Sequence, residues 1–209
     1  MPTKGDFEHL PSIKQATILS VGINAFSQSA YKEVSTDAIT TACGISKGLL
    51  FHYFGSKRAF YLYCLSTALQ RLTAQTALLT EGDFFEILFG AMDEKFKLCK
   101  SLPKETHFVN LASREVCSEI ADEKNALLQK YMAETHARSA KQLQAAIAAL
   151  PLNTPAAPQT LSGLQLYINA ILSKYLITYQ NNPDAFFANA DTIKTEMKAY
   201  LQLMLNGIL

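Results

Sequence analysis

Residues 35–57, STDAITTACGISKGLLFHYFGSK, constrain the fold more than any other part of this chain. Ser35 is a suitable N-cap, because its hydroxyl can accept hydrogen bonds from the free amides of a first helical turn. Gly44 suits the left-handed conformation in which helices commonly end. Ser46 and Ser56 can cap the next two helices. The spacing therefore predicts two short helices joined by a tight turn, followed by the start of a third.

The second of these short helices has an unusual composition. No acidic residue lies between Asp37 and the Lys57–Arg58 pair. Leu50 and Phe54, four residues apart, predict its buried stripe. The residues expected on or near its outward faces are Lys47, Gly48, Phe51, His52 and Tyr53. A short helix that is basic, aromatic and free of carboxylates suits a DNA groove.

The preceding segment predicts one more helix. Its apolar and small residues follow helical spacing: Ile18, Val21, Gly22, Ala25 and Phe26. A glycine inside a helix costs about 1 kcal/mol relative to Ala. We therefore expect a neighbouring helix to approach closely at Gly22. Residues 12–57 should form a three-helix bundle from which a fourth helix leads out.

The run ILSVGINAFSQSAY followed by VSTDAITTACGISKGLLFHYFGSKRAF resembles the DNA-binding domain of the TetR/AcrR family of transcriptional regulators over residues 18–65. The order of the motifs matches as well as their types. Several positions depart from the family pattern. Ala30 stands where Gly is usual, Thr40 where Ala is frequent, and Cys43 where a small residue is common. Phe51 replaces a Tyr whose hydroxyl often meets a phosphate.

The resemblance implies a dimer that places residues 46–53 of each copy in a major groove of a near-palindromic operator. The residues expected at DNA are Ser35, Thr36, Ser46, Lys47, Gly48, Leu49, Phe51, His52, Tyr53 and Lys57. Lys47 is the expected base reader, because Lys can donate to O6 and N7 of guanine. Tyr53, Lys57 and the helix start at Ser35 and Thr36 are expected at phosphates.

The 209 residues suffice for a DNA-binding domain and one larger domain. We expect residues 1–56 to form the DNA-binding helix-turn-helix domain and residues 57–209 the ligand-binding and dimerisation domain. Helices are predicted over about residues 57–79 and 83–100, and another begins at Pro103. Further helices are predicted over about 122–150, 159–181 and 184–207, with a loop at 151–158. The predicted fold is all-α, with about nine helices in total.

The last two predicted helices, within residues 159–207, are the candidates for a homodimer interface. Their apolar residues are Leu161, Leu164, Tyr167, Ile168, Ile171, Leu172, Tyr175 and Leu176, then Ile193, Met197, Tyr200, Leu201, Met204 and Leu205. Some of them must form intrachain core. The resemblance implies that two such helices pair with their copies in a four-helix interface.

Aromatic residues are dense between 84 and 136, which invites two interpretations. They could line an apolar cavity for a small effector, as the resemblance implies, or form ordinary core. The candidate ligand-binding residues are Phe85, Phe89, Phe96, Phe108, Tyr131 and His136.

Other classes of function lack their signatures. No glycine-rich phosphate loop, GxSxG or HExxH motif occurs, so we expect no enzyme and no cofactor. The four cysteines show no CxxC pair, which predicts reduced, mostly buried thiols and no metal site. No secretory signal or membrane-length apolar run is visible, so a cytoplasmic protein without membrane contact is expected. Residues 1–11 suggest a flexible arm.

These observations predict a DNA-binding transcriptional regulator, a repressor released from its operator by a small apolar or aromatic ligand. The alternative is a nucleoid-associated adaptor of the same fold that has no small-molecule effector.

Overall fold

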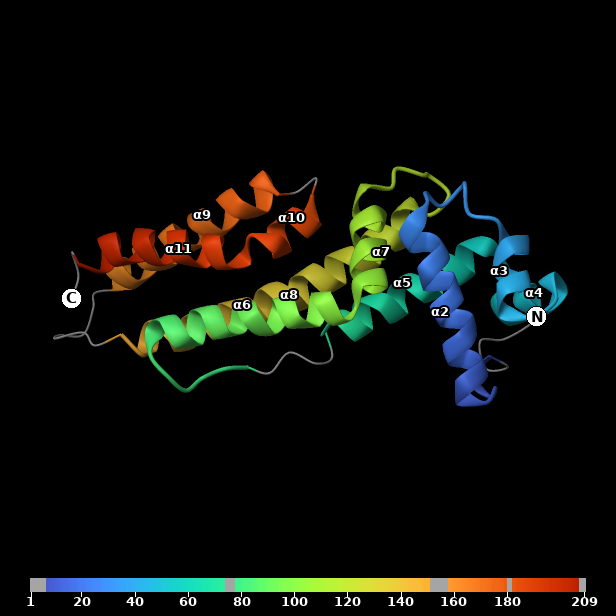
Figure 1. Cartoon of the computed structure of the whole chain (residues 1–209), viewed down its shortest axis with the longest axis horizontal. Helices are drawn as coiled ribbons and strands as arrows, with labels where there is room; N and C mark the ends of the chain where they lie inside the picture. Colours follow the sequence, from blue (N-terminus) through green and yellow to red (C-terminus); the bar gives the residue numbers. More distant parts are fainter. Residues whose placement is uncertain (1–6, 74–77, 151–157, 180–181, 207–209) are drawn as a thin grey trace. The chain divides into compact units, whose positions relative to one another are not determined.

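The computed structural model describes residues 7–73, 78–150, 158–179 and 182–206. Within these ranges it contains ten helices, α2 to α11, and no strand (Figure 1). The predicted all-α class is confirmed. The count is ten rather than about nine because the last predicted helix is interrupted at Asn189, which separates α10 from α11.

The N-terminal helices are α2 (Ser12–Gln28), α3 (Thr36–Cys43), α4 (Lys47–Phe54) and α5 (Lys57–Thr73). They are followed by α6 (Phe84–Ser101), α7 (Pro103–Arg114), α8 (Ala121–Ala148), α9 (Pro158–Thr178), α10 (Pro183–Ala188) and α11 (Ala190–Leu205). The helix predicted over 57–79 is too long, because residues 78 and 79 are not helical and residues 74–77 lie outside the described ranges. Pro158 of the predicted loop begins α9, and the rest of that loop is likewise not described.

The chain divides into two compact units. Unit 1 comprises residues 1–76 and 97–136, and unit 2 comprises residues 77–96 and 137–209. In unit 1, α7 packs against both α2 and α5. The helix-turn-helix segment therefore shares a compact unit with α5, α7 and the beginning of α8. The functional division at residue 56 remains a prediction.

The core of unit 1 depends on a close approach of α2 to α5. A Cβ atom at Gly22 would lie 2.5 Å from Cζ of Phe60 and 2.7 Å from Sγ of Cys64, both of which are fully buried. The predicted reason for this glycine is therefore confirmed. One turn further along α2, the Phe26 ring stacks on Phe108 of α7 at 5.6 Å and meets the Tyr61 ring edge-on at 4.9 Å.

The described start of the chain is not a flexible arm. Phe7 is buried, and its ring lies 4.8 Å from that of Phe54 and 5.5 Å from that of Tyr63. The prediction of an arm is thus wrong for residues 7–11, where an aromatic side chain anchors the segment in the core. Residues 1–6 lie outside the described ranges.

Unit 2 has a separate apolar core, formed by α6, the end of α8, α9 and α11. Ile168, Ile171 and Leu201, which the sequence offered as part of the dimer face, are buried in this core. Gln142 of α8 supports it with its amide: Oε1 accepts a hydrogen bond from the Leu79 backbone N–H at 3.0 Å, and Nε2 donates to the Leu79 carbonyl.

Replacing Gly22 with Ala should lower the stability of the protein. Overpacking a core costs about 1–3 kcal/mol, whereas the better helix propensity of Ala returns at most about 1 kcal/mol. The expected observation is a lower midpoint of urea unfolding. Gly48→Ala is the matched control, since a Cβ atom there meets nothing nearer than Ser46 Oγ at 3.9 Å. A Gly22→Ala variant as stable as wild type would contradict the close approach of α2 to α5.

Candidate nucleic-acid interface

Helices α3 and α4 are joined by a turn whose geometry follows from its sequence. The Ser35 hydroxyl accepts a hydrogen bond from the Ala38 amide at 3.3 Å, and the Ser46 hydroxyl accepts one from Leu49 at 3.1 Å. Gly44 ends α3 in the left-handed conformation, at φ 65°. Its amide donates to the Thr41 carbonyl at 3.1 Å. The predicted caps and helix end are therefore confirmed.

One face of α4 is buried, and it is broader than the sequence indicated. Leu50 and Phe54 are buried as predicted. Tyr53, predicted to face outward, is only 7% exposed, so that prediction is wrong. The ring of Phe7 covers it edge-on at 5.9 Å.

The opposite side of α4 faces solvent. Ser46, Lys47, Gly48 and His52 are exposed, whereas Leu49 and Phe51 are partly buried. Lys47 Nζ lies 3.0 Å from a carboxylate oxygen of Asp37, on the first turn of α3. The sequence did not indicate this pairing, because ten residues separate the two side chains.

Lys57, the predicted phosphate contact at the start of α5, is held by the loop before α3. Its Nζ atom lies 4.8 Å above the centre of the Tyr31 ring and donates to the Lys32 carbonyl at 3.3 Å. Burial lowers the pKa of the Lys57 ammonium, and the negative charge of Glu119 opposes that shift.

Tyr31 connects this loop to the segment between α7 and α8. Its backbone N–H donates to Glu115 Oε2 at 2.8 Å, and its hydroxyl donates to Glu119 Oε1 at 2.6 Å. Burial and the bond to Glu119 raise the pKa of the Tyr31 phenol. The Lys124 ammonium fixes the same segment by donating to the carbonyls of Ala112 and Glu115. More than eighty residues separate Tyr31 from these carboxylates, so no local sequence signal could identify the pairs.

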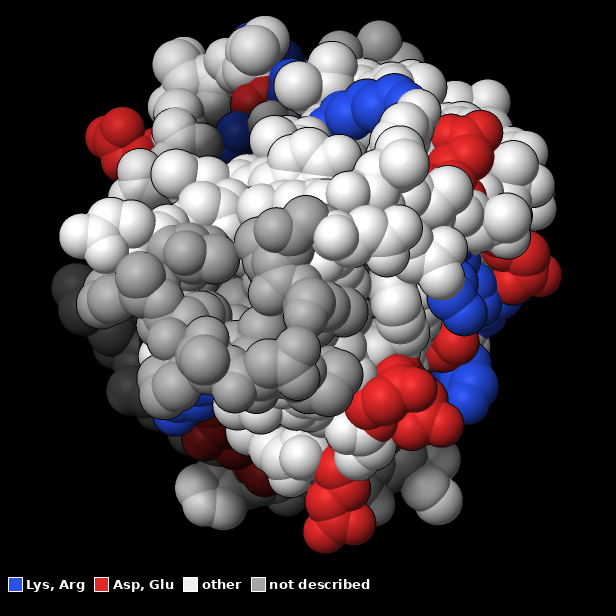
Figure 2. Space-filling view, turned by 90° about the vertical axis from the view of Figure 1, so that its left-hand side faces the viewer, with Lys and Arg blue, Asp and Glu red and all other residues white. Residues whose placement is uncertain are grey.

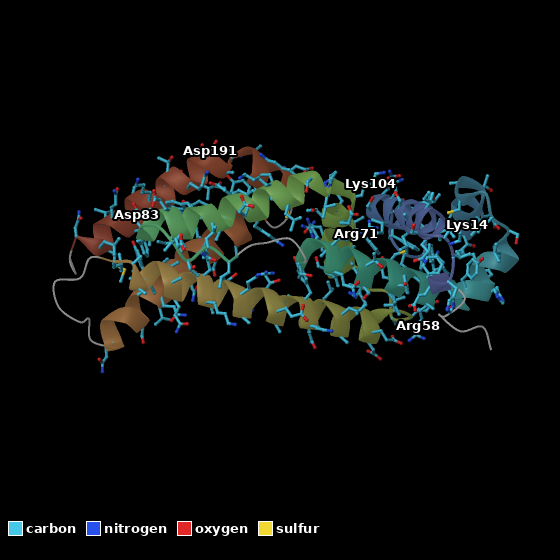
Figure 3. The ribbon with its side chains drawn as sticks, turned by 90° about the horizontal axis from the view of Figure 1, so that it is seen from below. Lys14, Arg58, Arg71, Asp83, Lys104 and Asp191 are labelled. Atoms are coloured by element: carbon cyan, nitrogen blue, oxygen red, sulfur yellow. The ribbon has the colours of Figure 1, made fainter. Side chains whose placement is uncertain are left out.

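Two ion pairs attach α5 to its neighbours within unit 1. Arg58 pairs with Glu123 of α8, and Arg71 Nη1 lies 2.7 Å from Oε1 of Glu105 on α7. Figure 3 labels both arginines, Arg58 near the start of α5 and Arg71 near its end. The helix that leads out of the helix-turn-helix segment is therefore bound to α7 and α8 by charge, and to α7 by packing as well.

The six predicted ligand residues do not share one cluster. Phe108 is fully buried in the core of unit 1, Tyr131 packs at the edge of that core, and His136 is exposed. Phe85, Phe89 and Phe96 belong to unit 2.

The aromatic residues of unit 2 form two sets. Phe85 and Phe89 are half-buried and stacked at 5.8 Å, and Lys198 Nζ lies 5.1 Å above the Phe85 ring. Phe96 instead packs edge-on against Phe186 and Phe187 of α10. Phe186 and Phe187 are not among the predicted ligand residues, because they lie outside the aromatic-rich stretch between 84 and 136.

Other kinds of site are not visible in the described ranges. They contain no group of three or more His, Cys, Asp or Glu side chains arranged to hold a metal ion. The four cysteines are free thiols; Cys64, Cys99 and Cys117 are buried and Cys43 is half-buried, as predicted. Among the helices described, none combines the length and apolarity needed to cross a membrane.

Comparisons with known proteins agree with this geometry. Residues 18–64, from α2 into α5, match the family model described as bacterial regulatory proteins, tetR family. No curated protein matches the sequence.

Solved structures extend the likeness to the whole fold. A TetR family transcriptional regulator from Chloroflexus aurantiacus J-10-FL is 19% identical, with a TM-score of 0.56 over 98% of this chain and 97% of that one. A tetR-family regulator from Streptomyces coelicolor is 18% identical, with a TM-score of 0.60 over 94% and 90%. A putative tetR family regulator from Shewanella sp. PV-4 is 17% identical, with a TM-score of 0.55 over 93% and 97%.

At these identities the solved structures establish the fold, while the family match establishes the nature of the N-terminal segment. Residues 18–64 therefore carry the TetR-family DNA-binding domain, in a chain that has the fold of the TetR-family transcriptional regulators.

Proposed function

We propose that the protein regulates transcription by placing α4 in the major groove of DNA, with a second copy on the other half of a near-palindromic operator. Gly48, on the exposed first turn of α4, is the observation that carries this proposal. Glycine inside a helix is destabilising by about 0.5–1 kcal/mol relative to Ala. A Cβ atom at Gly48 would meet only Ser46 Oγ, at 3.9 Å. Since no described residue requires glycine here, the glycine is best explained by a surface that approaches from outside.

The neighbouring residues supply the contacts that such a surface needs. Lys47 provides a cation for a base edge at the start of α4. Ser35, Thr36 and Ser46 lie at two helix N-termini, where free amides and the helix dipole favour phosphate. Lys57 provides a further cation for the DNA backbone. Phe51 and His52, further along α4, are also expected at the DNA. Because Tyr53 is only 7% exposed, we assign it a phosphate contact only through the small part of its side chain that reaches solvent.

Gly48→Ala should stabilise the protein while weakening its binding to DNA. The added methyl group removes backbone freedom from the unfolded chain, which is worth about 0.4–1 kcal/mol. The same group stands between α4 and the groove. The measurement pairs a urea unfolding curve with fluorescence anisotropy on a duplex that the wild type selects from a random pool. Unchanged DNA affinity would contradict a groove-facing Gly48. A wild type that selects no duplex would refute the proposed function.

Dimerisation is proposed through α9 and α11. The only charged residue of α9 is Lys174, and its Nζ lies about equally close to the rings of Tyr175 and Tyr200, at 5.0 and 4.9 Å. Opposite the core-facing stripe, α9 exposes an uncharged stripe made up of Ser162, Leu166, Asn169, Ser173 and Ile177. The exposed stripe on α11 comprises Thr192, Thr195, Ala199, Gln202 and Leu203.

The surface of unit 2 supports this choice. Leu166 is 70% exposed and Leu203 73%, although both are large and apolar. Figure 2 faces the end of unit 2 where the described chain stops, and most of its described surface is uncharged. Large apolar side chains exposed within uncharged stripes on both helices are consistent with a surface that a second copy covers.

A Leu166→Glu, Leu203→Glu double variant should be a folded monomer at micromolar concentration. Both side chains are exposed, so the charges enter the proposed interface and not the core. Sedimentation equilibrium measures the mass, with Met132→Glu, an exposed position of α8 in unit 1, as the control that stays dimeric. Charges at Ile171 or Leu201 would not test the interface, because both residues are buried. A monomeric wild type would end the dimer proposal.

We further propose that a small apolar or aromatic ligand releases the protein from its operator, so that the protein acts as a repressor. Phe85 and Phe89 support this best among the six candidates, because their stacked rings are only half-buried. The Tyr31 contacts and the Arg58 and Arg71 ion pairs tie the helix-turn-helix segment to α7 and α8, which offers a route by which movement of those helices reaches α4.

An effector should weaken the operator complex by roughly 5- to 150-fold, which is the change in affinity that typical coupling free energies produce. Phe89→Ala should reduce that response while operator affinity stays unchanged, because Phe89 lies outside the helix-turn-helix segment. Titrating the operator complex with a library of apolar and aromatic compounds measures both quantities, and a promoter reporter gives the sign of regulation. If no compound shifts the affinity, the adaptor without an effector replaces the ligand-released repressor.

A further inference from the structure

Asp37 and Lys47 form an ion pair across the α3–α4 turn. The Lys47 Nζ atom lies 3.0 Å from Asp37 Oδ2, and the two side chains are 48% and 70% exposed. Between residues 36 and 56, all of them described, Asp37 is the only acidic residue and Lys47 the only Lys or Arg. Within this segment, Asp37 is therefore the only carboxylate that can pair with Lys47, and Lys47 the only Lys or Arg that can pair with Asp37.

The position of Lys47 explains why it needs a partner. It is the first residue of α4, where the positive end of the helix dipole disfavours a cation. Asp37 occupies the first turn of α3, where the dipole favours an anion. The pair therefore offsets an unfavourable charge at the start of α4 and holds the Lys47 ammonium toward α3.

The pair also changes what DNA encounters at the start of α4. While it is closed, Lys47 contributes no net charge to phosphate binding, because salt-dependent affinity comes from cations that neutralise phosphates. If Lys47 leaves for a phosphate, the Asp37 carboxylate is left unpaired beside the negatively charged backbone. If Lys47 instead reaches guanine, it gains two acceptors, O6 and N7, from one base.

We propose that Asp37 is a specificity-determining residue of the DNA interface, which acts by restricting Lys47 to sequences that present guanine at its position. This proposal rests on the proposed DNA-binding function. Asp37 penalises binding to the wrong duplex more than it assists binding to the right one, which is a common way to obtain specificity. The carboxylate itself need not contact a base.

The test compares Asp37→Asn with wild type on two duplexes, one selected by the wild type from a random pool and one scrambled to the same composition. Asn keeps the size of the side chain and removes its charge. Affinity for the scrambled duplex should rise about two- to five-fold, which is the fold-change that the free energy of an exposed charge pair corresponds to. The salt dependence of that binding should steepen by about one unit of slope, because Lys47 is free to neutralise a phosphate. Affinity for the selected duplex should change less, so the ratio of the two affinities falls.

The same substitution in a Lys47→Ala background separates this mechanism from general repulsion. If Asp37 acts through Lys47, adding Asp37→Asn to the Lys47→Ala variant leaves the salt dependence of binding to scrambled DNA unchanged. An equal effect of Asp37→Asn on both duplexes, or a steeper slope that persists without Lys47, would overturn the proposal while leaving DNA binding intact. A wild type that selects no duplex at all would overturn the proposed function and this proposal with it. Thermal unfolding by circular dichroism confirms that each variant is folded.

Discussion

The packing of α2 on α5 at Gly22 is the contact on which unit 1 depends. Because Gly22 has no side chain, the ring of Phe60 and the thiol of Cys64 occupy the space beside its backbone. This approach lets Phe26 reach the aromatic rings of both α5 and α7. A side chain at position 22 would therefore strain the core that the helix-turn-helix segment shares with α5 and α7.

Two glycines in the helices of unit 1 have opposite explanations. Gly22 is required by the atoms that surround it inside the protein. A Cβ atom at Gly48, on the exposed side of α4, would meet only Ser46 Oγ at 3.9 Å among the described residues, so these would accept a larger residue. Packing inside the protein explains Gly22, whereas the explanation that we propose for Gly48 lies in a partner outside it. The sequence alone does not distinguish them, because it does not show which residues pack beside each glycine.

The sequence could predict structure wherever the cause is local. Ser35, Gly44 and Ser46 act within a few residues of themselves, and the helix-turn-helix followed as predicted. The burial of Tyr53 was missed because its cover, Phe7, comes from a segment that has no helical periodicity in the sequence. The predicted contacts of individual residues with DNA remain predictions, since they depend on a partner.

Longer-range features could not be predicted. The hydrogen bonds of Tyr31 to Glu115 and Glu119 depend on where α7 ends relative to α2, which the order of residues does not reveal. Likewise, an aromatic-rich stretch does not distinguish a core ring such as Phe108 from half-buried rings such as Phe85 and Phe89. These distinctions depend on which helices become neighbours.

Methylation interference on a selected duplex tests the central claim most directly, because the chemistry distinguishes the two grooves. Guanine N7 lies in the major groove and adenine N3 in the minor groove. If α4 of each copy enters the major groove, methylation of guanine N7 should block binding in two clusters about one helical turn, roughly 10 base pairs, or a multiple of it apart. Interference confined to adenine N3, or a single cluster without a two-fold partner, would contradict the account.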